Sequence, residues 1–209
     1  MIFHAFLIKY AEIAIKGKNR YVFEEALVAQ IRRALKKTEG SFEVVREQGR
    51  VYVRCPEEYD YDEVVTALQH VFGIVYICPV MIFEDGGMEA LCADVTEYMK
   101  TVHPSYDGSF KVYTRRARKS WPVTSMETSA AVGEAILSAF PQAHVDVHDP
   151  DLTVSIEIRE KMYVYSVSIR GAGHAPAFRR HRFAGGGLYG REARRHDRCR
   201  VFPRASLHQ

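Results

Sequence analysis

Apolar and polar residues alternate in a pattern that predicts strands and helices along most of the chain. Residues 2–9 are rich in Phe, Ile and Leu and alternate loosely, which indicates a strand. Apolar side chains then recur every four residues from 20 to 37, as expected of a helix with one buried face. Two short alternating segments, 42–47 and 51–55, flank Gln48-Gly49 and predict a hairpin. The first unit therefore has the order β-α-β-β.

A second unit begins near the acidic stretch 57–63, which is typical of the solvated start of a helix. Thr124 and Glu127 form a capping-box signature, which predicts that a helix begins at Ser125. The other elements of this unit are expected, in order, as a strand over 73–83, an amphipathic helix over 88–99, a strand over 110–113, a helix over 125–140 and a hairpin of two strands over 152–158 and 163–169.

These patterns predict an α+β protein with a first domain at 1–57, a second at 58–170 and a tail at 171–209. A length of 209 residues, of which 47% are hydrophobic, is enough to build packed cores. No apolar run approaches the roughly 20 residues that cross a bilayer, so we expect no membrane partner. The first residues lack the basic start of a signal peptide, and we expect a cytoplasmic location.

The net charge of +3 is divided unevenly along the chain. Residues 1–170 carry a net charge of −4, whereas residues 171–209 carry nine Arg, no Lys and two acidic residues, for a net charge of +7. Any anion-binding site in the body of the chain must therefore be a local patch. The four cysteines are scattered, which favours small buried hydrophobic residues over a disulfide framework or a zinc site.

Two basic clusters lie at equivalent places, each between a strand and the start of a helix. The first is Lys16, Lys18 and Arg20, and the second is Arg115, Arg116, Arg118 and Lys119, followed by Trp121. Cations oppose the dipole of a helix N-terminus, and a bound phosphate would remove that conflict. Two such sites on adjacent domains could follow a phosphate backbone, with Trp121 as a stacking surface for an unpaired base. The pattern therefore favours RNA binding over a merely solvated surface.

Signals for catalysis are weaker. His144 and His148 are four residues apart, but Val-Asp-Val between them indicates a strand or turn, so they do not share a helix face for a metal. No Gly-rich nucleotide motif and no Gly-x-Ser-x-Gly motif is present, and no cysteine has a local pairing signature with His. We expect no catalytic residue, no metal and no cofactor in this chain.

The segment Leu7-Ile8-Lys9-Tyr10-Ala11-Glu12-Ile13-Ala14-Ile15-Lys16-Gly17-Lys18-Asn19-Arg20 resembles the N-terminal motif of the tRNA 4-thiouridine synthetases, or tRNA sulfurtransferases. Ala11 departs from the usual Gly of that motif. The resemblance continues through residues 111–119, 151–159 and 171–173, and covers about 170 residues. It implies a ferredoxin-like domain followed by an α/β THUMP domain.

In that family the two domains hold the acceptor region of tRNA. A following adenylating (PP-loop) domain uses ATP to make 4-thiouridine at position 8, with sulfur from a cysteine desulfurase, and the same sulfur can serve the thiazole of thiamine. The resemblance thus implies that this chain is the tRNA-binding part of such an enzyme, with homodimerisation left open. The residues expected to contact RNA are Lys9, Lys16, Lys18, Asn19, Arg20, Arg115, Arg116, Arg118, Lys119 and Trp121.

The resemblance stops after Gly173, where the family continues toward a Ser-Gly-Gly-x-Asp-Ser phosphate loop that this sequence lacks. The tail is rich in Gly, Ala, Arg, Pro and His, as GC-rich codons read out of frame would be. Codons for Val-Tyr-Phe-His-Ala-Pro-Pro-Tyr-Thr, a segment similar to the adenylating domain, can give residues 201–208 when read from the third nucleotide. We interpret the tail as a frameshifted remnant of that domain and expect it to be disordered; the competing interpretation is a natural basic tail.

Three other functions remain open from the sequence. The chain could be a free-standing THUMP adaptor that presents tRNA to a separate enzyme. It could instead be a small-molecule regulatory module built on the ferredoxin-like unit, whose ligand binding would not depend on Arg115 or Arg116. A hydrolase that uses His144, His148 or Cys55 is the weakest alternative, because it requires turnover without RNA or ATP.

Overall fold

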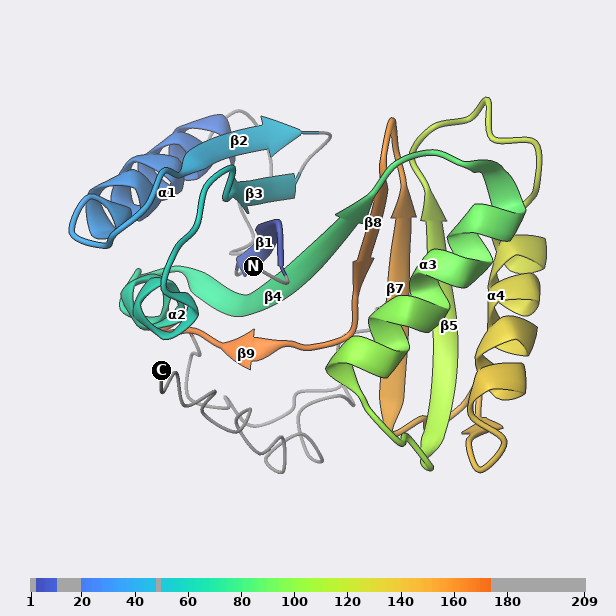
Figure 1. Cartoon of the computed structure of the whole chain (residues 1–209). Helices are drawn as coiled ribbons and strands as arrows, with labels where there is room; N and C mark the ends of the chain where they lie inside the picture. Colours follow the sequence, from blue (N-terminus) through green and yellow to red (C-terminus); the bar gives the residue numbers. More distant parts are fainter. Residues whose placement is uncertain (1–2, 11–19, 48–49, 174–209) are drawn as a thin grey trace, which may run out of the picture. The chain divides into compact units, whose positions relative to one another are not determined.

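The computed structural model describes residues 3–10, 20–47 and 50–173 (Figure 1). The described helices are α1 (Arg20–Leu35), α2 (Tyr61–Gln69), α3 (Gly87–Val102) and α4 (Ser125–Ala139). The described strands are β1 (Ala5–Tyr10), β2 (Glu43–Glu47), β3 (Arg50–Arg54), β4 (Ile74–Phe83), β5 (Ser109–Arg116), β6 (His144–Val145), β7 (Leu152–Ile158), β8 (Met162–Tyr165) and β9 (Ile169–Arg170). Within these residues, no helix combines the length and apolar character needed to cross a membrane.

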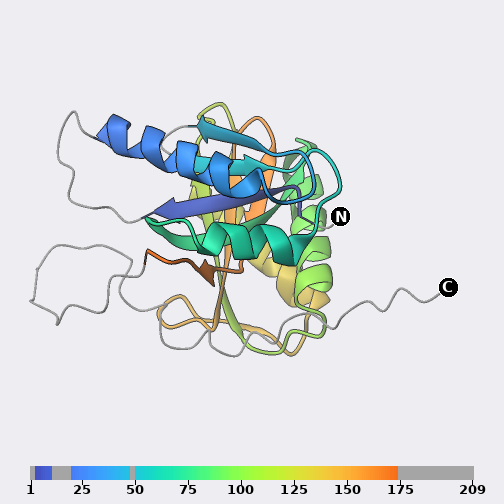
Figure 2. The ribbon, with the colours of Figure 1, turned by 90° about the vertical axis from the view of Figure 1, so that its left-hand side faces the viewer.

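The first half of the chain is a ferredoxin-like β-α-β-β-α-β unit. Its strands pair antiparallel in the order β2-β3-β1-β4. Strand alternation sends Phe6 and Ile8 of β1 into a core with Leu27 and Ile31 of α1, while Leu7 points to the opposite face. Figure 2 shows α1 and α2 side by side over this sheet. The predicted β-α-β-β order is confirmed, and α2 and β4 complete the unit.

The second half places α3 and α4 against one face of a mixed sheet (Figure 1). β5 pairs parallel with both β6 and β7, and β8 returns antiparallel to β7. Apolar side chains on alternate positions, such as Phe110 of β5 and Val154 of β7, meet Val95 of α3 and Val132 of α4. The capping box at Thr124 and Glu127 starts α4 as predicted. This is the α/β unit expected of a THUMP domain.

Strand β4 belongs to both halves. Ile74–Val80 pairs with β1, and Met81–Phe83 pairs with β8, so the described strands form one sheet. The face of this sheet that carries no helix has its own apolar cluster, which we call the helix-free face. That cluster consists of Ala5, Leu7, Tyr52, Cys78, Val80, Tyr163 and Tyr165.

The boundary between the halves differs from the one expected at 57/58. Val64 and Leu68 of α2 and Ile77 of β4 are buried in the same core as Phe6. The acidic stretch is the solvated start of a helix, as expected, but the apolar face of that helix covers the first half of the sheet and not the second. The first unit therefore extends into β4.

The expected return strand over 163–169 is also split in two. β8 ends at Tyr165, and β9 pairs instead with Tyr76 and Ile77 of β4. Between them, the Ser166 hydroxyl lies 2.7 Å from the Tyr98 hydroxyl and 2.7 Å from His103 Nε2, both from α3 and its C-terminal end. These contacts hold the chain as it passes from one half to the other.

Gly171 and Gly173 follow β9 and allow a close backbone approach. A Cβ at Gly171 would lie 2.5 Å from the carbonyl oxygen of Ile74, and one at Gly173 would lie 2.7 Å from it. The amide of Gly173 donates to that same carbonyl at 2.8 Å. Any side chain at either position would push the chain away from β4, so the Gly-x-Gly pattern is a packing requirement.

Several sequence expectations lie outside the described residues. They are the RNA contacts at Lys16, Lys18 and Asn19, the turn at Gln48-Gly49, and the frameshift and disorder expected of 174–209. Arg20 is the first residue of α1, but its side chain is not among those described.

Candidate nucleic-acid interface

Strand β5 is longer than the sequence pattern predicted, and it includes Arg115 and Arg116. Because successive strand residues point to opposite faces, these two arginines serve different surroundings. The guanidinium of Arg116 donates hydrogen bonds to the backbone carbonyls of Trp121 at 3.1 Å and Val123 at 3.2 Å. Arg116 therefore holds the loop between β5 and α4 in place, although we expected it to contact RNA.

Arg118 lies in that loop and is engaged by the protein from two sides. It forms an ion pair with Asp85, just before α3, with a separation of 2.5 Å. Its guanidinium also lies 5.6 Å from the centre of the Trp121 ring. The hydrogen bond from Arg118 and the amide of Gly87 together lower the pKa of Asp85. Arg118 thus ties the loop to α3, and its charge is partly compensated.

Trp121 does not offer the stacking surface expected from the sequence. Only 4% of it is exposed, and it packs into the core of the second half with side chains from α3, α4 and the sheet. Arg116 holds its carbonyl and Arg118 lies over its ring, so the indole faces the interior. The prediction that Trp121 stacks on an unpaired base is corrected by this burial.

Lys119 and Arg115 are the members of the second basic cluster that remain for a ligand. Neither makes a hydrogen bond or ion pair with any side chain that the structure describes, and Lys119 is exposed. The positive end of the α4 dipole already has a negative group beside it, because the carboxylate of Glu127 accepts a hydrogen bond from the backbone amide of Thr124 at 3.0 Å. Glu127 also accepts from the Thr124 hydroxyl at 2.7 Å, and the hydrogen bonds from this hydroxyl and from the amide lower the pKa of Glu127. The conflict between cations and helix dipole that the sequence suggested is therefore reduced by this carboxylate.

The helix-free face brings together residues from both ends of the chain. Phe110, Val112 and Thr114 of β5 point toward the helices. The residues between and after them, Lys111, Tyr113 and Arg115, therefore point the other way and lie on the helix-free face. Tyr113 pairs with Ser155 of β7, which pairs with Tyr165 of β8. The Lys9 ammonium lies 5.5 Å from the centre of the Tyr165 ring.

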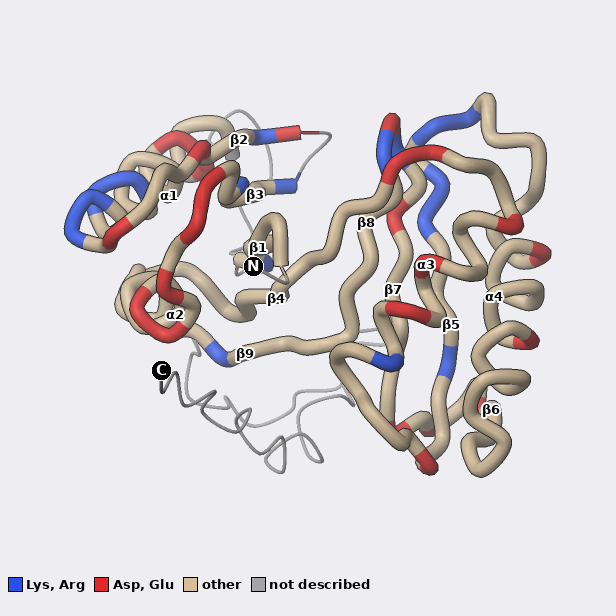
Figure 3. Tube along the Cα trace, viewed as in Figure 1, with Lys and Arg blue, Asp and Glu red and all other residues tan. Residues whose placement is uncertain are grey.

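Lys9 and Arg115, both predicted as RNA contacts, thus lie on one face of a continuous sheet. Lys111 and Tyr113 lie on the same face, although neither was among the residues expected to contact RNA. The alternation in Lys-Val-Tyr-Thr-Arg could have identified them, because it places two cations and an aromatic ring on the same side of a strand. Figure 3 shows these basic positions along β5 and continuing into the loop that follows it.

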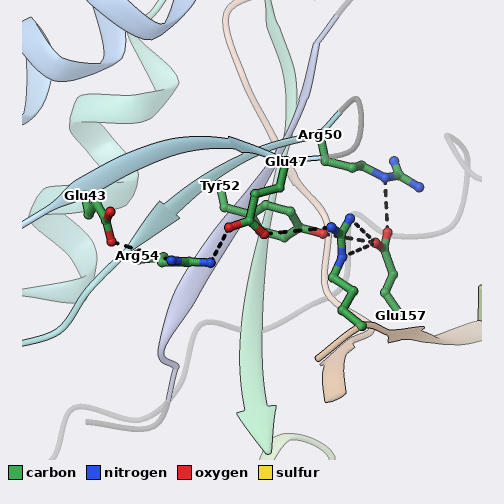
Figure 4. Close-up of polar contacts among 7 residues, drawn as sticks. Glu43, Glu47, Arg50, Tyr52, Arg54 and Glu157 are labelled. Atoms are coloured by element: carbon green, nitrogen blue, oxygen red, sulfur yellow. Dashed lines mark hydrogen bonds and ion pairs between the residues drawn. The ribbon is translucent and has the colours of Figure 1, made fainter. Parts of the chain in front are cut away.

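A buried ionic network joins the two halves beside this face (Figure 4). Glu157 of β7 is 1% exposed, accepts a hydrogen bond from the Tyr52 hydroxyl at 3.0 Å and lies 2.8 Å from Arg159. Its other oxygen lies 3.1 Å from Nε of Arg50. Burial and the Glu157 charge raise the pKa of Tyr52. The tyrosine therefore acts only as a neutral donor.

The network extends along β2 and β3 to a balanced set of charges. Arg54 pairs with both Glu43 and Glu47, and Glu47 lies 3.8 Å from Arg159. The Arg159 guanidinium also lies over the rings of Tyr52 and Tyr163, at 5.1 and 5.7 Å from their centres. With three arginines and three glutamates, the network leaves little net charge for a ligand, and its role is to connect strands.

The residues considered for hydrolysis show no catalytic arrangement. Cys55 is buried, and burial raises the pKa of its thiol to about 12, which disfavours a nucleophilic thiolate. His144 and His148 are exposed, and Asp146 between them accepts hydrogen bonds from the amides of His148 and Asp149 as in a turn. These three residues therefore give no support to the hydrolase alternative.

Comparison with known proteins identifies both halves. Residues 5–78 match the ThiI ferredoxin-like domain, and residues 87–167 match the THUMP domain. A probable tRNA sulfurtransferase of Agathobacter rectalis is 54% identical over 175 residues, which is 84% of this chain and 44% of that protein. One from Lachnospira eligens is 47% identical over 84% of this chain and 45% of its own length. The chain thus spans less than half the length of these curated relatives.

Two solved structures are similar in fold to most of this chain. The Pyrococcus horikoshii protein PH1313 is 32% identical with a TM-score of 0.67, over 83% of this chain and 57% of its own. A 4-thiouridine synthetase solved with RNA and ATP is 26% identical with a TM-score of 0.64, over 82% and 42% of the two chains. With both domain matches in sequence order, residues 5–167 of this chain are the ferredoxin-like and THUMP region of the tRNA sulfurtransferase family.

Proposed function

We propose that this chain binds the acceptor region of tRNA and is the tRNA-binding part of an ATP-dependent tRNA sulfurtransferase. The observation that carries the proposal is that Lys9 and Arg115 both lie on the helix-free face of one continuous sheet. These residues come from different domains, and cations spread along one face suit an extended phosphate backbone. The RNA complex of the similar 4-thiouridine synthetase supports the same class of ligand.

The chemistry in this proposal belongs to other parts of the enzyme. Adenylation of uridine 8 by ATP, with release of pyrophosphate, would take place on an adenylating domain. Sulfur from a cysteine desulfurase would then displace AMP from the activated base to give 4-thiouridine. The same sulfur could serve thiamine synthesis. In this proposal the chain needs no cofactor of its own and acts in the cytoplasm. Homodimerisation would be a property of the complete enzyme.

Salt-dependent tRNA binding tests the proposal. Purified chain is titrated with unmodified tRNA over a range of salt concentrations, and log Kd is plotted against log salt. We expect a slope of roughly 0.7 to 0.9 per phosphate contacted, falling by one such increment in the Lys119→Gln variant. Lys100→Gln, on the last turn of α3, is the matched control and should leave the slope unchanged. A slope near zero for the unaltered chain would refute the proposal.

A further inference from the structure

Tyr113 is an exposed aromatic residue in the middle of a basic strand. It is 47% exposed on β5, two residues from Lys111 on one side and two from Arg115 on the other. All three side chains lie on the helix-free face, because Phe110, Val112 and Thr114 point toward the helices. About half of this side chain is open to solvent, so the ring is accessible to a ligand on this face.

The strand is accessible at its edge as well as on this face. Among the described strands, β6 pairs only with Ser109 and Phe110 of β5, so β5 has no neighbour on that side from Lys111 onward. Charged residues on an edge strand also prevent pairing with other chains. That role accounts for Lys111 and Arg115, but it does not account for an exposed ring between them.

The polar groups around the ring favour a nucleic acid over an acidic protein. Tyr113 lies opposite the uncharged Ser155 of β7, with Thr153 opposite Lys111 and Glu157 opposite Arg115. Glu157 is buried and is already bound to Tyr52 and Arg159. Lys111 donates to the carbonyl of Val147 at 3.2 Å, which fixes its ammonium beside the strand. Cations spaced on both sides of an open aromatic ring match the alternation of phosphates and bases in a single strand.

We propose that Tyr113 stacks on an unpaired nucleotide of the bound RNA, with Lys111 and Arg115 contacting the flanking phosphates. The inference rests on the proposed function and deepens it, because it assigns an unpaired nucleotide of the RNA to a specific side chain. Tyr113 takes the role that the sequence suggested for Trp121. Stacking on a tyrosine requires an unpaired base, because bases within a duplex already stack on each other.

The test compares two RNAs that differ only in an unpaired end. One is a short duplex with a single-stranded 3′ extension, and the other is the same duplex with blunt ends. Tyr113→Ala should weaken binding of the extended RNA about five- to fifty-fold and leave the blunt duplex unchanged. Tyr113→Phe, which keeps the ring, should bind both RNAs as the unaltered chain does. Phe72→Ala removes another exposed ring, on the turn between α2 and β4, and should change neither affinity.

A second measurement does not depend on removing the ring. The chain has one tryptophan, Trp121, and it is buried, so Tyr113→Trp places a fluorescent reporter at the proposed contact. The extended RNA should quench its emission, and the blunt duplex should not. Equal loss of affinity for both RNAs in Tyr113→Ala, or no loss and no quenching, would overturn the stacking role while the proposed function stands. If the unaltered chain binds neither RNA nor tRNA, the proposed function itself fails.

Discussion

The hydroxyl of Tyr52 on β3 donates a 3.0 Å hydrogen bond to the carboxylate of Glu157 on β7, a residue 105 positions further along the chain. The two residues belong to different domains, the ferredoxin-like domain and the THUMP domain. Arg50 and Arg159 bind the same carboxylate. The domains are therefore connected by a buried acidic group as well as by the shared strand β4, and the cations of both domains sit on the sheet that this connection maintains.

Removing Glu157 should destabilise the chain strongly. In Glu157→Ala the Arg159 guanidinium, which is 6% exposed, loses its nearest carboxylate inside the protein. Leaving a buried charge without its partner costs about 3–5 kcal/mol, whereas Tyr52→Phe should cost about 1 kcal/mol because only one neutral donor is lost. Urea unfolding measures both. A Glu157→Ala variant within about 1 kcal/mol of the unaltered chain would show that the network contributes little.

Arg116 and Lys119 should behave differently although both belong to the basic segment after β5. Arg116→Ala removes two hydrogen bonds to loop carbonyls, so we expect a loss of stability of about 1 kcal/mol. Lys119→Ala removes an exposed side chain and should change stability by less than about 0.5 kcal/mol. Thermal unfolding of the two variants, followed by RNA titration, separates the structural cation from the ligand-binding one. Equal melting temperatures would contradict the assignment.

Much of this arrangement was predictable where the signal was local. The capping box at Thr124 and Glu127 defines the start of α4 because both partners lie within one turn. The end of β5 was not predictable, because Arg115 and Arg116 continue the strand only through pairing with Glu157 and Ile158, more than 40 positions away along the chain. The burial of Trp121 has the same origin, since its surroundings come from several distant elements.

The capping carboxylate of Glu127 gives α4 a pH dependence in acid. Its pKa in the folded chain lies below the usual value of 4.5, because it accepts hydrogen bonds from Thr124. Because the pKa of Glu127 is lower in the folded chain than in the unfolded chain, its ionised carboxylate stabilises the fold at pH values above the unfolded pKa. This stabilisation is lost as the pH falls through the folded pKa. The unaltered chain should therefore melt above Glu127→Gln at pH 7, and the gap between the two melting temperatures should narrow as pH falls below 4.5. A gap that is as large at pH 3 as at pH 7 would mean that the charge is not the cause.

Burial should control how the cysteines react with alkylating reagents. Cys55 and Cys78 are buried, and the pKa of Cys55 is raised to about 12, so at pH 8 about one thiol in ten thousand is ionised. Cys92 is only partly buried. Iodoacetamide at pH 8, followed by mass spectrometry of peptides, should label Cys92 well before Cys55 and Cys78, and urea should abolish the difference. Labelling of Cys55 as fast as Cys92 would contradict the buried placement of the strand that precedes it.

The composition of residues 174–209 leads to a prediction about the coding DNA. Nine arginines without a lysine, in a tail rich in Gly and Ala, are expected when GC-rich codons are read in the wrong frame. The DNA downstream of the Ile169 codon, resequenced and translated in all three frames, should then contain Ser-Gly-Gly-x-Asp-Ser in a shifted frame. Restoring that frame should yield a chain that consumes ATP in the presence of tRNA. If no frame encodes the motif, the frameshift interpretation is wrong, and the tail becomes a basic segment whose removal should lower RNA affinity and the salt slope together.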